Sequence, residues 1–276
     1  MATLALPRVR PSAPALHGLY GSHPGFLAAA HRGGAALAPE NTLAAFGLAR
    51  GLGLTYLETD VRTTADGVPL AFHDATLDRV TSLRGALAGR TWAEVRHTRV
   101  LGREPVLPLE NLLAAWPDAC VMIDVKEERA IRPTIAAIRR TGSAARVCVA
   151  GGWDTWLAAI RHECGPQLTT ALGWRSLTAL IACARTGTRP PAAVASGAFA
   201  HVAWRLGRLS VMARPRVAAR LVQMAHDLGL RVITWTIDEP ASIGRLLDDG
   251  VDGVITDRPD VLRDVLVARG EWAPVR

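Results

Sequence analysis

The chain has 276 residues, of which 49% are hydrophobic, and its formal net charge at pH 7 is +7. This length fits one large β/α-barrel or two ordinary domains, and no apolar run reaches the roughly 18 residues that a membrane-spanning helix requires. The excess of arginine favours anionic partners. Because the arginines are scattered and no nucleic-acid-binding motif occurs, we do not expect a nucleic acid as partner.

The N-terminus and the cysteines bear on the cellular compartment. Residues 1–26 lack the basic start, long apolar stretch and cleavage site of a signal peptide, and we expect them to form an arm. Cys120, Cys148, Cys164 and Cys183 do not have the spacing of a metal finger. Free thiols are typical of a reducing compartment, so we expect a cytoplasmic protein without a stable membrane anchor. No pattern in the sequence predicts an oligomeric state.

Strand-like and helix-like segments alternate after this arm. FLAAAHRG (26–33) has the apolar character of a first strand, and a helix is expected over 41–53. LTYLETDVR (54–62) predicts a second strand. VPLAFHD (68–74) follows the turn sequence ADG and predicts a further extended segment close to the second strand.

Residues 75–118 interrupt the alternation with short helical fragments joined by Gly and Pro, and we expect a small insertion there. Strands are then expected at 121–126, 146–153, 167–173, 200–204, 231–238 and 252–257. Helices are expected near 128–141, 153–163, 176–186, 215–228 and 240–249.

This alternation implies parallel strands joined by crossover helices. About eight such units suit a closed barrel better than an open sheet, and no GxGxxG follows the first strand as a dinucleotide-binding sheet would require. We therefore predict an α/β fold, a (β/α)8 TIM barrel over residues 27–265. A small insertion (75–118) follows the second strand region, and residues 266–276 form a C-terminal tail.

Polar side chains interrupt the apolar strands near their C-terminal ends, where the reactive groups of a β/α-barrel gather. Glu58 and Asp60 are two residues apart, so both point to one face of their strand, and Asp124 occupies a later strand. Three carboxylates in one barrel mouth repel one another, and a divalent cation relieves that repulsion. Oxygen ligands favour Mg²⁺ or Ca²⁺. Buried ion pairs, for example Glu58 with Arg62 or Asp124 with Lys126, are the structural alternative.

Two histidines and two cationic residues occupy comparable positions. His31 ends the first strand and His73 ends the extended segment, and two imidazoles near a metal suit general acid–base catalysis at neutral pH. Arg32 and Lys126, which is the only lysine in the chain, add positive charge where a phosphodiester would bind. The remaining histidines, His201 among them, are expected to be ordinary core or surface residues.

The same residues carry a resemblance to a known family. HRGGAALAPENTLAAF (31–46) resembles the opening signature of the glycerophosphodiester phosphodiesterases, and ETDVRTTADGVPLAFHDATLDRVT (58–81) resembles their second block. Later blocks are matched by IDVK (123–126), TWTID (234–238) and DGVITDRPD (252–260). The resemblance spans roughly residues 27–262, although the middle, about 145–225, matches only in its strand–helix rhythm.

The resemblance implies a β/α-barrel enzyme that uses a divalent metal to hydrolyse glycerophosphodiesters to an alcohol and glycerol 3-phosphate. It implies an acid–base pair at His31 and His73, metal ligands at Glu58, Asp60 and Asp124, phosphate contacts at Arg32 and Lys126, and an aromatic residue near the glycerol at Trp235. The third carboxylate is often Glu in this family, whereas here it is Asp124.

Other functions fit parts of the pattern. One is a phospholipase D-like or lysophospholipase D-like activity on the same barrel, and another is a non-catalytic barrel that binds phosphoesters. A third is an aldolase-like barrel with a Schiff base at Lys126, against which the E-x-D pair and the two histidines argue. The sequence leaves open the choice of Mg²⁺ or Ca²⁺, and of water or a substrate hydroxyl as nucleophile.

Overall fold

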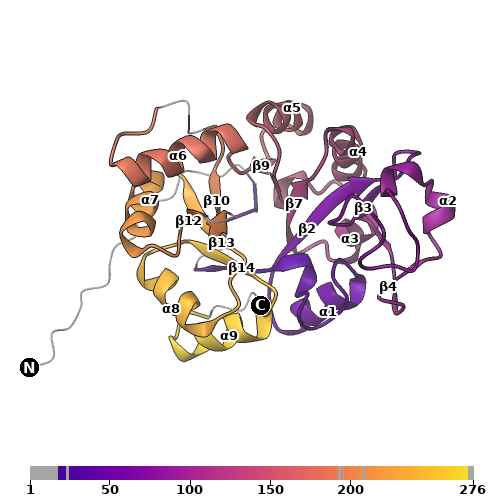
Figure 1. Ribbon diagram of the computed structural model, residues 1–276, viewed down its shortest axis with the longest axis horizontal. Helices are drawn as coiled ribbons and strands as arrows, with labels where there is room; N and C mark the ends of the chain where they lie inside the picture. Colours follow the sequence, from indigo (N-terminus) through magenta and orange to yellow (C-terminus); the bar gives the residue numbers. More distant parts are fainter. Residues whose placement is uncertain (1–17, 23–24, 192–193, 195, 207–208, 273–276) are drawn as a thin grey trace, which may run out of the picture.

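The computed structural model describes residues 18–22, 25–191, 194, 196–206 and 209–272 (Figure 1). Residues 1–17 and 23–24 of the expected arm, and residues 273–276 of the expected tail, lie outside the described part of the chain.

Eight parallel strands form the centre of the molecule. They run in the spatial order β10-β13-β14-β1-β2-β7-β8-β9. Their bounds are β1 (Leu27–Ala30), β2 (Tyr56–Thr63), β7 (Cys120–Val125), β8 (Val147–Ala150), β9 (Thr169–Thr170), β10 (Phe199–Ala203), β13 (Arg231–Trp235) and β14 (Gly253–Thr256). A parallel bridge between Ala171 and Phe199 joins β9 back to β10 and closes the sheet. The predicted (β/α)8 barrel is confirmed.

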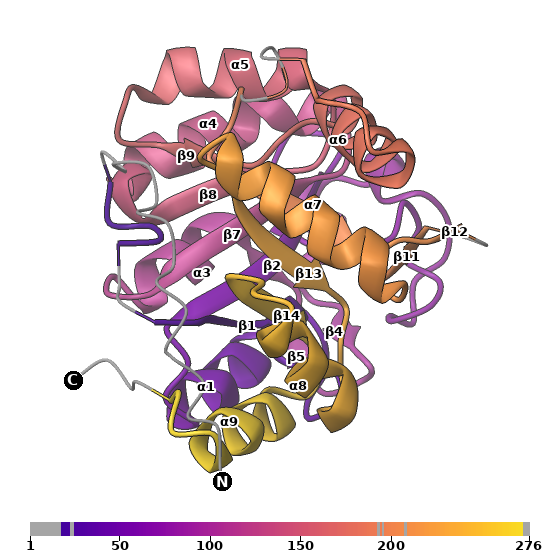
Figure 2. The same cartoon turned by 90° about the vertical axis from the view of Figure 1, so that its left-hand side faces the viewer.

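A helix follows each barrel strand and packs on the outside of the barrel (Figures 1 and 2). These helices are α1 (Leu43–Gly51), α3 (Leu109–Ala115), α4 (Ile131–Arg140), α5 (Asp154–Cys164), α6 (Trp174–Thr186), α7 (Pro215–Asp227), α8 (Pro240–Asp248) and α9 (Pro259–Ala268). Short 3-10 turns occupy His31–Gly33, Leu87–Gly89, Glu128–Ala130 and Ala144–Arg146, and a hairpin of β11 (Arg205–Leu206) and β12 (Leu209–Ser210) follows β10. Within the described ranges, no helix has the length and apolar character that crossing a bilayer requires.

Residues 69–108 form a small insertion lobe between β2 and α3. In it, β3 (Pro69–Ala71) runs antiparallel to β2, and β6 (Leu107–Pro108) runs antiparallel to β3. The lobe also contains α2 (Trp92–Val95), β4 (Arg99–Val100) and β5 (Glu104–Pro105). Its apolar side chains form a cluster of their own, made of Leu70, Phe72, Leu77, Val80, Leu87, Val95, Val100 and Val106. The helix α3, by contrast, packs into the main core of the barrel.

Side chains inside the barrel alternate with those that face the helices. In β7, Met122 belongs to the interior cluster and Ile123 packs toward the helices, so the next interior position is Asp124. In β2, the same step of two leads from Tyr56 to Glu58. The interior is therefore apolar at the N-terminal ends of these strands and polar at their C-terminal ends.

Tyr20 closes the N-terminal end of the barrel. Its fully buried ring meets Tyr56 and Phe199 edge-on, with centroids 5.4 Å apart in each pair, and its backbone N–H donates to the carbonyl of Ala145 at 3.0 Å. Tyr20, which was expected in the arm, therefore packs as part of the barrel.

We expect Tyr20→Ala to lower the free energy of unfolding by about 3–5 kcal/mol, because it removes a buried aromatic ring and leaves a cavity. The neighbouring Leu19 is 60% exposed, so Leu19→Ala is the matched control and should cost less than about 0.5 kcal/mol. Chemical denaturation followed by circular dichroism gives both values. Equal, small losses would show that Tyr20 contributes nothing to the barrel core.

Candidate active site

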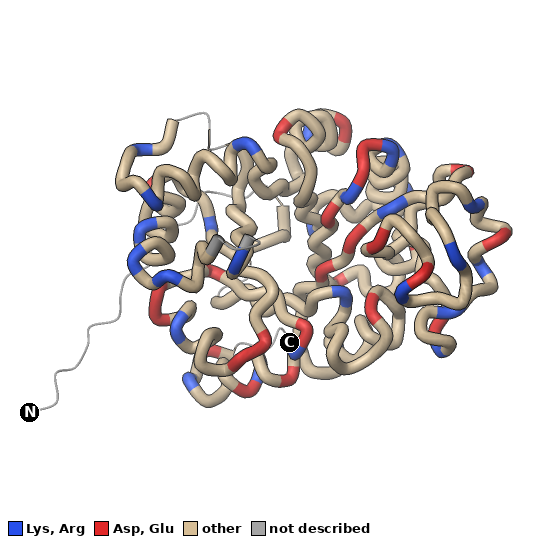
Figure 3. The backbone as a smooth tube through the Cα atoms, viewed as in Figure 1, with Lys and Arg blue, Asp and Glu red and all other residues tan. Residues whose placement is uncertain are grey.

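A cavity opens at the C-terminal ends of the barrel strands, and all eight site residues predicted from the sequence line it. They are His31, Arg32, Glu58, Asp60, His73, Asp124, Lys126 and Trp235. Counted out to its open mouth, the cavity measures about 760 Å³, which is the size of a small-molecule site. Basic residues elsewhere are scattered along the chain (Figure 3). The cavity, in contrast, brings Arg32 and Lys126 together in one wall.

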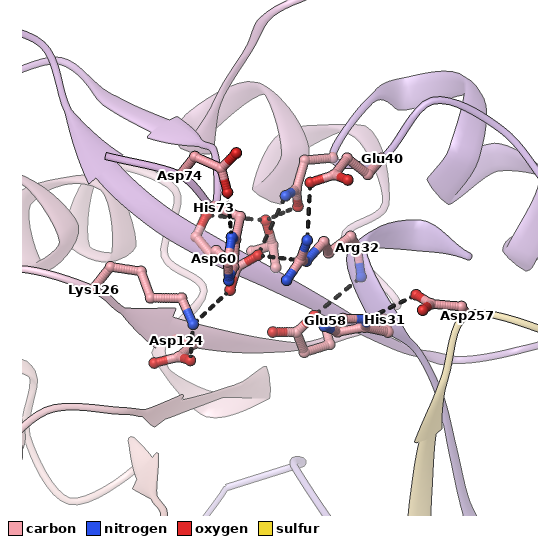
Figure 4. Close-up of polar contacts among 12 residues, drawn as sticks. His31, Arg32, Glu40, Glu58, Asp60, His73, Asp74, Asp124, Lys126 and Asp257 are labelled. Atoms are coloured by element: carbon pink, nitrogen blue, oxygen red, sulfur yellow. Dashed lines mark hydrogen bonds and ion pairs between the residues drawn. The ribbon is translucent and has the colours of Figure 1, made fainter. Parts of the chain in front are cut away.

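Asp60 lies at the centre of a charged wall formed by β1, β2 and β7. Its buried carboxylate is paired with Arg32 Nε at 3.0 Å and with Lys126 Nζ at 2.8 Å. Lys126 also pairs with Asp124, which is the register partner of Asp60 on β7 (Figure 4). Burial alone would raise the pKa of Asp60, but Lys126 and Arg32 outweigh burial and hold that pKa below its ordinary value. Asp60 is therefore ionised within a neutralised cluster.

One of the two ion pairs considered from the sequence is present. Asp124 pairs with Lys126, whereas Arg62 pairs with Glu127 at 3.2 Å and not with Glu58. Burial lowers the pKa of Lys126, but the two aspartates outweigh burial and raise that pKa above its ordinary value. A Schiff base requires a neutral amine, so this environment disfavours the aldolase-like alternative.

Glu58 has no lysine or arginine side chain as an ion-pair partner among the described residues. Its Oε2 accepts a hydrogen bond from the backbone N–H of Arg32 at 3.0 Å and lies 3.9 Å from His31 Nε2. Burial, and then the negative charge of Asp60, raise the pKa of Glu58 to about 7. Glu58 therefore holds its proton more tightly than an exposed glutamate does, and additional positive charge nearby would favour its ionised form.

A divalent cation fits this balance of charges. When Glu58 is ionised, three carboxylates (Glu58, Asp60 and Asp124) face two cationic side chains (Arg32 and Lys126) in the cavity wall. An anionic phosphodiester needs more positive charge than this, and carboxylate oxygens are the ligands that Mg²⁺ and Ca²⁺ prefer. In the described part of the chain, the acids do not converge on a ready-made coordination site, and Lys126 bridges Asp60 and Asp124.

Each candidate histidine is held by a carboxylate at Nδ1. Nδ1 of His31 lies 2.7 Å from Asp257, after β14, and Nδ1 of His73 lies 2.6 Å from Asp74 (Figure 4). With Nδ1–H donating to the carboxylate, Nε2 is the nitrogen left for proton transfer. Burial lowers the pKa of His31, but the charge of Glu58 and the hydrogen bond to Asp257 outweigh burial, so that pKa is raised.

Arg79, in the insertion lobe, connects the segment after β1 to the segment after β3. Its guanidinium donates to both oxygens of Glu40, each at 2.7 Å, and to both oxygens of Asp74 at 2.6 and 3.2 Å. Glu40 also accepts from Arg32 Nη1 at 3.0 Å. The contact with Arg79, followed by that with His73, lowers the pKa of Asp74 to about 2 despite partial burial. A continuous chain of polar contacts therefore runs from Arg32 to His73.

The remaining strands form an apolar wall. Its lining includes Ala150, Ala171, Leu172, Leu177 and Ile255. Trp235 and Trp174 also line the cavity, and Trp174 and the nearby Trp153 are 38% and 56% exposed. His201, expected from the sequence to be an ordinary residue, is buried in β10 but also lines the cavity. Asp257, Arg79 and His201 were not predicted as site residues, although Arg79 and Asp257 lie within the blocks 58–81 and 252–260 that resemble the family.

The chain is similar to proteins of one family. The sequence model of the Glycerophosphoryl diester phosphodiesterase family matches residues 31–261. A protein of Mycobacterium tuberculosis named as a probable glycerophosphodiester phosphodiesterase is 37% identical over 259 residues, which cover 91% of this chain and 94% of that protein.

Solved structures show the same likeness. A Silicibacter pomeroyi crystal structure assigned to the glycerophosphoryl diester phosphodiesterases has a TM-score of 0.73 and 26% identity, and the match covers 91% of this chain and 97% of that one. An Oleispira antarctica phosphodiesterase, solved in complex with its product sn-glycerol-3-phosphate, has a TM-score of 0.67 at 19% identity, with coverages of 88% and 97%. At that identity the second likeness is one of fold.

We expect Glu58→Gln to stabilise the chelated protein at pH 8 but not at pH 4. The pKa of Glu58 is about 7 in the folded protein, against an ordinary value of 4.5. The folded state therefore holds this proton more tightly, and the wild type loses stability as the pH rises from 4.5 through 7. The loss is on the order of 2–3 kcal/mol, and Gln does not incur it.

Thermal unfolding in EDTA between pH 4 and pH 8 measures this difference. Glu104→Gln, in the insertion lobe and outside the cavity, is the control. The difference in stability between this variant and the wild type should not grow with pH. Adding Mg²⁺ or Ca²⁺ should stabilise the wild type more than Glu58→Gln. A difference in stability between Glu58→Gln and the wild type that stays constant across the pH range would contradict the environment described for Glu58.

Proposed function

The chain belongs to the glycerophosphoryl diester phosphodiesterase family and is a phosphoric diester hydrolase; we propose that it cleaves glycerophosphodiesters to an alcohol and glycerol 3-phosphate, using a divalent cation and two histidines. One observation carries the proposal. His31 and His73, each held by an aspartate, line the same cavity as three carboxylates and two cationic side chains. This combination suits the cleavage of an anionic diester by acid–base catalysis.

Glu58, Asp60 and Asp124 are the proposed ligands of the cation, which is Mg²⁺ or Ca²⁺. When bound, such a cation neutralises the phosphodiester and polarises its phosphorus. Arg32 and Lys126 are proposed to contact the phosphate oxygens, because a guanidinium donates two parallel hydrogen bonds and an ammonium supplies a compact charge. Both side chains lie against Asp60 in the charged wall, which supports a phosphate position beside that wall.

The two histidines are proposed to move the protons. Nε2 of one accepts a proton from the nucleophile, and Nε2 of the other donates a proton to the alkoxide oxygen as its bond to phosphorus breaks. Asp257 and Asp74 orient the rings and stabilise each imidazolium while it carries the proton. With water as nucleophile the products form directly, whereas attack by a substrate hydroxyl gives a cyclic phosphate that water then opens. Trp235 is proposed to pack against the glycerol.

Trp153 and Trp174 favour a second candidate substrate. They lie after β8 and β9, Trp174 lines the cavity, and both are partly exposed. Partly exposed tryptophans suit a boundary between apolar and aqueous surroundings. A lysophospholipid, whose acyl chain requires such a surface, is therefore the second candidate, and its cleavage would use the same residues in a lysophospholipase D-like reaction.

The proposed partner is a small-molecule substrate, and the proposed location is the cytoplasm. The four cysteines are free thiols in the structure, two of them buried and two partly buried. Free thiols persist in a reducing compartment, which supports that location.

We expect the purified protein to release glycerol 3-phosphate from glycerophosphocholine or glycerophosphoethanolamine when Mg²⁺ or Ca²⁺ is present, and to stop releasing it in EDTA. A coupled assay for glycerol 3-phosphate measures both conditions. Lysophosphatidylcholine in a parallel reaction tests the second candidate. Absence of hydrolysis with every substrate and metal would leave a phosphoester-binding barrel as the better description.

His31→Ala and His73→Ala should each reduce turnover by about 10²–10⁴-fold, because each removes one partner of the proton transfers. His162→Ala, on the outer surface of α5, is the matched control and should keep the wild-type rate. Initial rates and circular dichroism of the three variants separate lost catalysis from lost folding. Wild-type turnover by either cavity variant would refute the assignment.

Asp257→Asn should shift the limb of the pH–rate profile that reports His31 to lower pH. The carboxylate of Asp257 stabilises the imidazolium of His31 and helps to raise its pKa, so removing that charge lowers the pKa. We also expect kcat to fall by roughly 10- to 10⁴-fold, because Asn can hold the wrong tautomer. An unchanged profile would show that Asp257 does not act through His31.

A further inference from the structure

His201 brings a polar ring to the apolar wall of the cavity. In β10, Phe199 and His201 both point inward, with ring centroids 6.2 Å apart. His201 is 8% exposed and lines the cavity, whereas Phe199 is fully buried below it at the closed end of the barrel. The ring therefore forms part of the wall that a bound molecule would meet.

Nε2 of His201 is buried and has no hydrogen-bond partner among the residues that the structure describes. Buried polar atoms are nearly always paired in folded proteins, and an unpaired one is unfavourable. A half-turn of the ring exchanges Nε2 with Cε1 and leaves the outline of the ring unchanged. Because the ring borders the cavity, a ligand atom there can supply the missing partner.

The chemistry of the ring indicates what kind of atom that is. Burial lowers the pKa of His201 to about 3, so the imidazole is neutral at physiological pH and offers one N–H donor and one nitrogen acceptor. A phosphate oxygen is better served by Arg32 and Lys126 on the charged wall. A group that both donates and accepts, as a hydroxyl does, matches a neutral imidazole.

The position of His201 indicates which hydroxyl. Ala203 is the register partner of Trp235 on the neighbouring strand, so His201 lies one inward step deeper in the barrel than Trp235. In a simple glycerophosphodiester such as glycerophosphocholine, the free hydroxyls belong to the glycerol. We propose that His201 is a specificity residue that hydrogen-bonds a glycerol hydroxyl of the substrate; this inference rests on the proposed function.

Two substrates and three variants test the proposal. The substrates are glycerophosphocholine and ethyl phosphocholine, which keeps the diester and the head group but lacks the glycerol hydroxyls. His201→Phe keeps a planar ring without hydrogen-bonding atoms, and His201→Gln keeps a donor and an acceptor. Met122→Leu changes an apolar residue that lines the same cavity and is the control for altered shape.

We expect His201→Phe to lower kcat/KM for glycerophosphocholine by roughly 10- to 100-fold and to change that for ethyl phosphocholine by less than about 3-fold. His201→Gln should recover part of the loss, and Met122→Leu should affect both substrates alike. Inhibition constants give the same comparison without turnover of the analogue. His201→Phe should weaken inhibition by glycerol 3-phosphate and leave inhibition by ethyl phosphate unchanged.

The outcomes separate this inference from the proposed function. Equal losses on both substrates, or unchanged discrimination in His201→Phe, overturn the role of His201 and leave the phosphodiesterase activity in place. If the wild type cleaves neither diester with any metal, both proposals fall. Thermal melting identifies a variant that does not fold, and His201→Leu, which also lacks hydrogen-bonding atoms, then carries the comparison in place of His201→Phe.

Discussion

The burial of Glu58 and Asp60 on one face of β2 is the constraint on which the site depends. A buried carboxylate without a partner protonates instead of remaining charged. The barrel prevents this at Asp60 with two cations, Arg32 from the end of β1 and Lys126 from the end of β7. Arg32 adopts a left-handed backbone conformation with φ of 51°; its N–H meets Glu58 while its side chain reaches Asp60. That conformation is unfavourable outside glycine and persists where neighbouring contacts hold it.

The insertion lobe is part of the site and not only a cover for the barrel edge. His73 and Asp74 follow its first strand, and Arg79 joins them to Glu40 in the segment between β1 and α1. Leu77 and Val80 flank Arg79 in the sequence and are buried in the core of the lobe, so the guanidinium is carried on a packed segment. One set of polar contacts therefore connects Arg32 to His73 through the lobe.

Strand periodicity explains what the sequence could predict. The spacing of Glu58 and Asp60 places both inside the barrel, and the same rule places Asp124 there. Periodicity does not say what lies across the barrel. The contact between His31 and Asp257 joins residues 226 positions apart, and only the closed sheet brings them together. Tyr20 belongs to no strand-like or helix-like pattern, so periodicity could not place it in the core. The alternation in β10 places His201 inside the barrel but does not distinguish a residue that lines the cavity from an ordinary core residue.

The contacts of Asp124 explain why a short acid suits this position. It faces Asp60 across the β2–β7 register, and Lys126 bridges the two carboxylates. Gly151, with φ of 76°, leaves the space that the Asp124 carboxylate occupies, because a Cβ at Gly151 would collide with its Oδ1. A glutamate at position 124 would carry the carboxylate beyond this space. An arginine at position 126 would not replace Lys126, because its planar guanidinium is broader than the compact ammonium that lies between the two aspartates. The short acid, the glycine and the single lysine therefore form one arrangement.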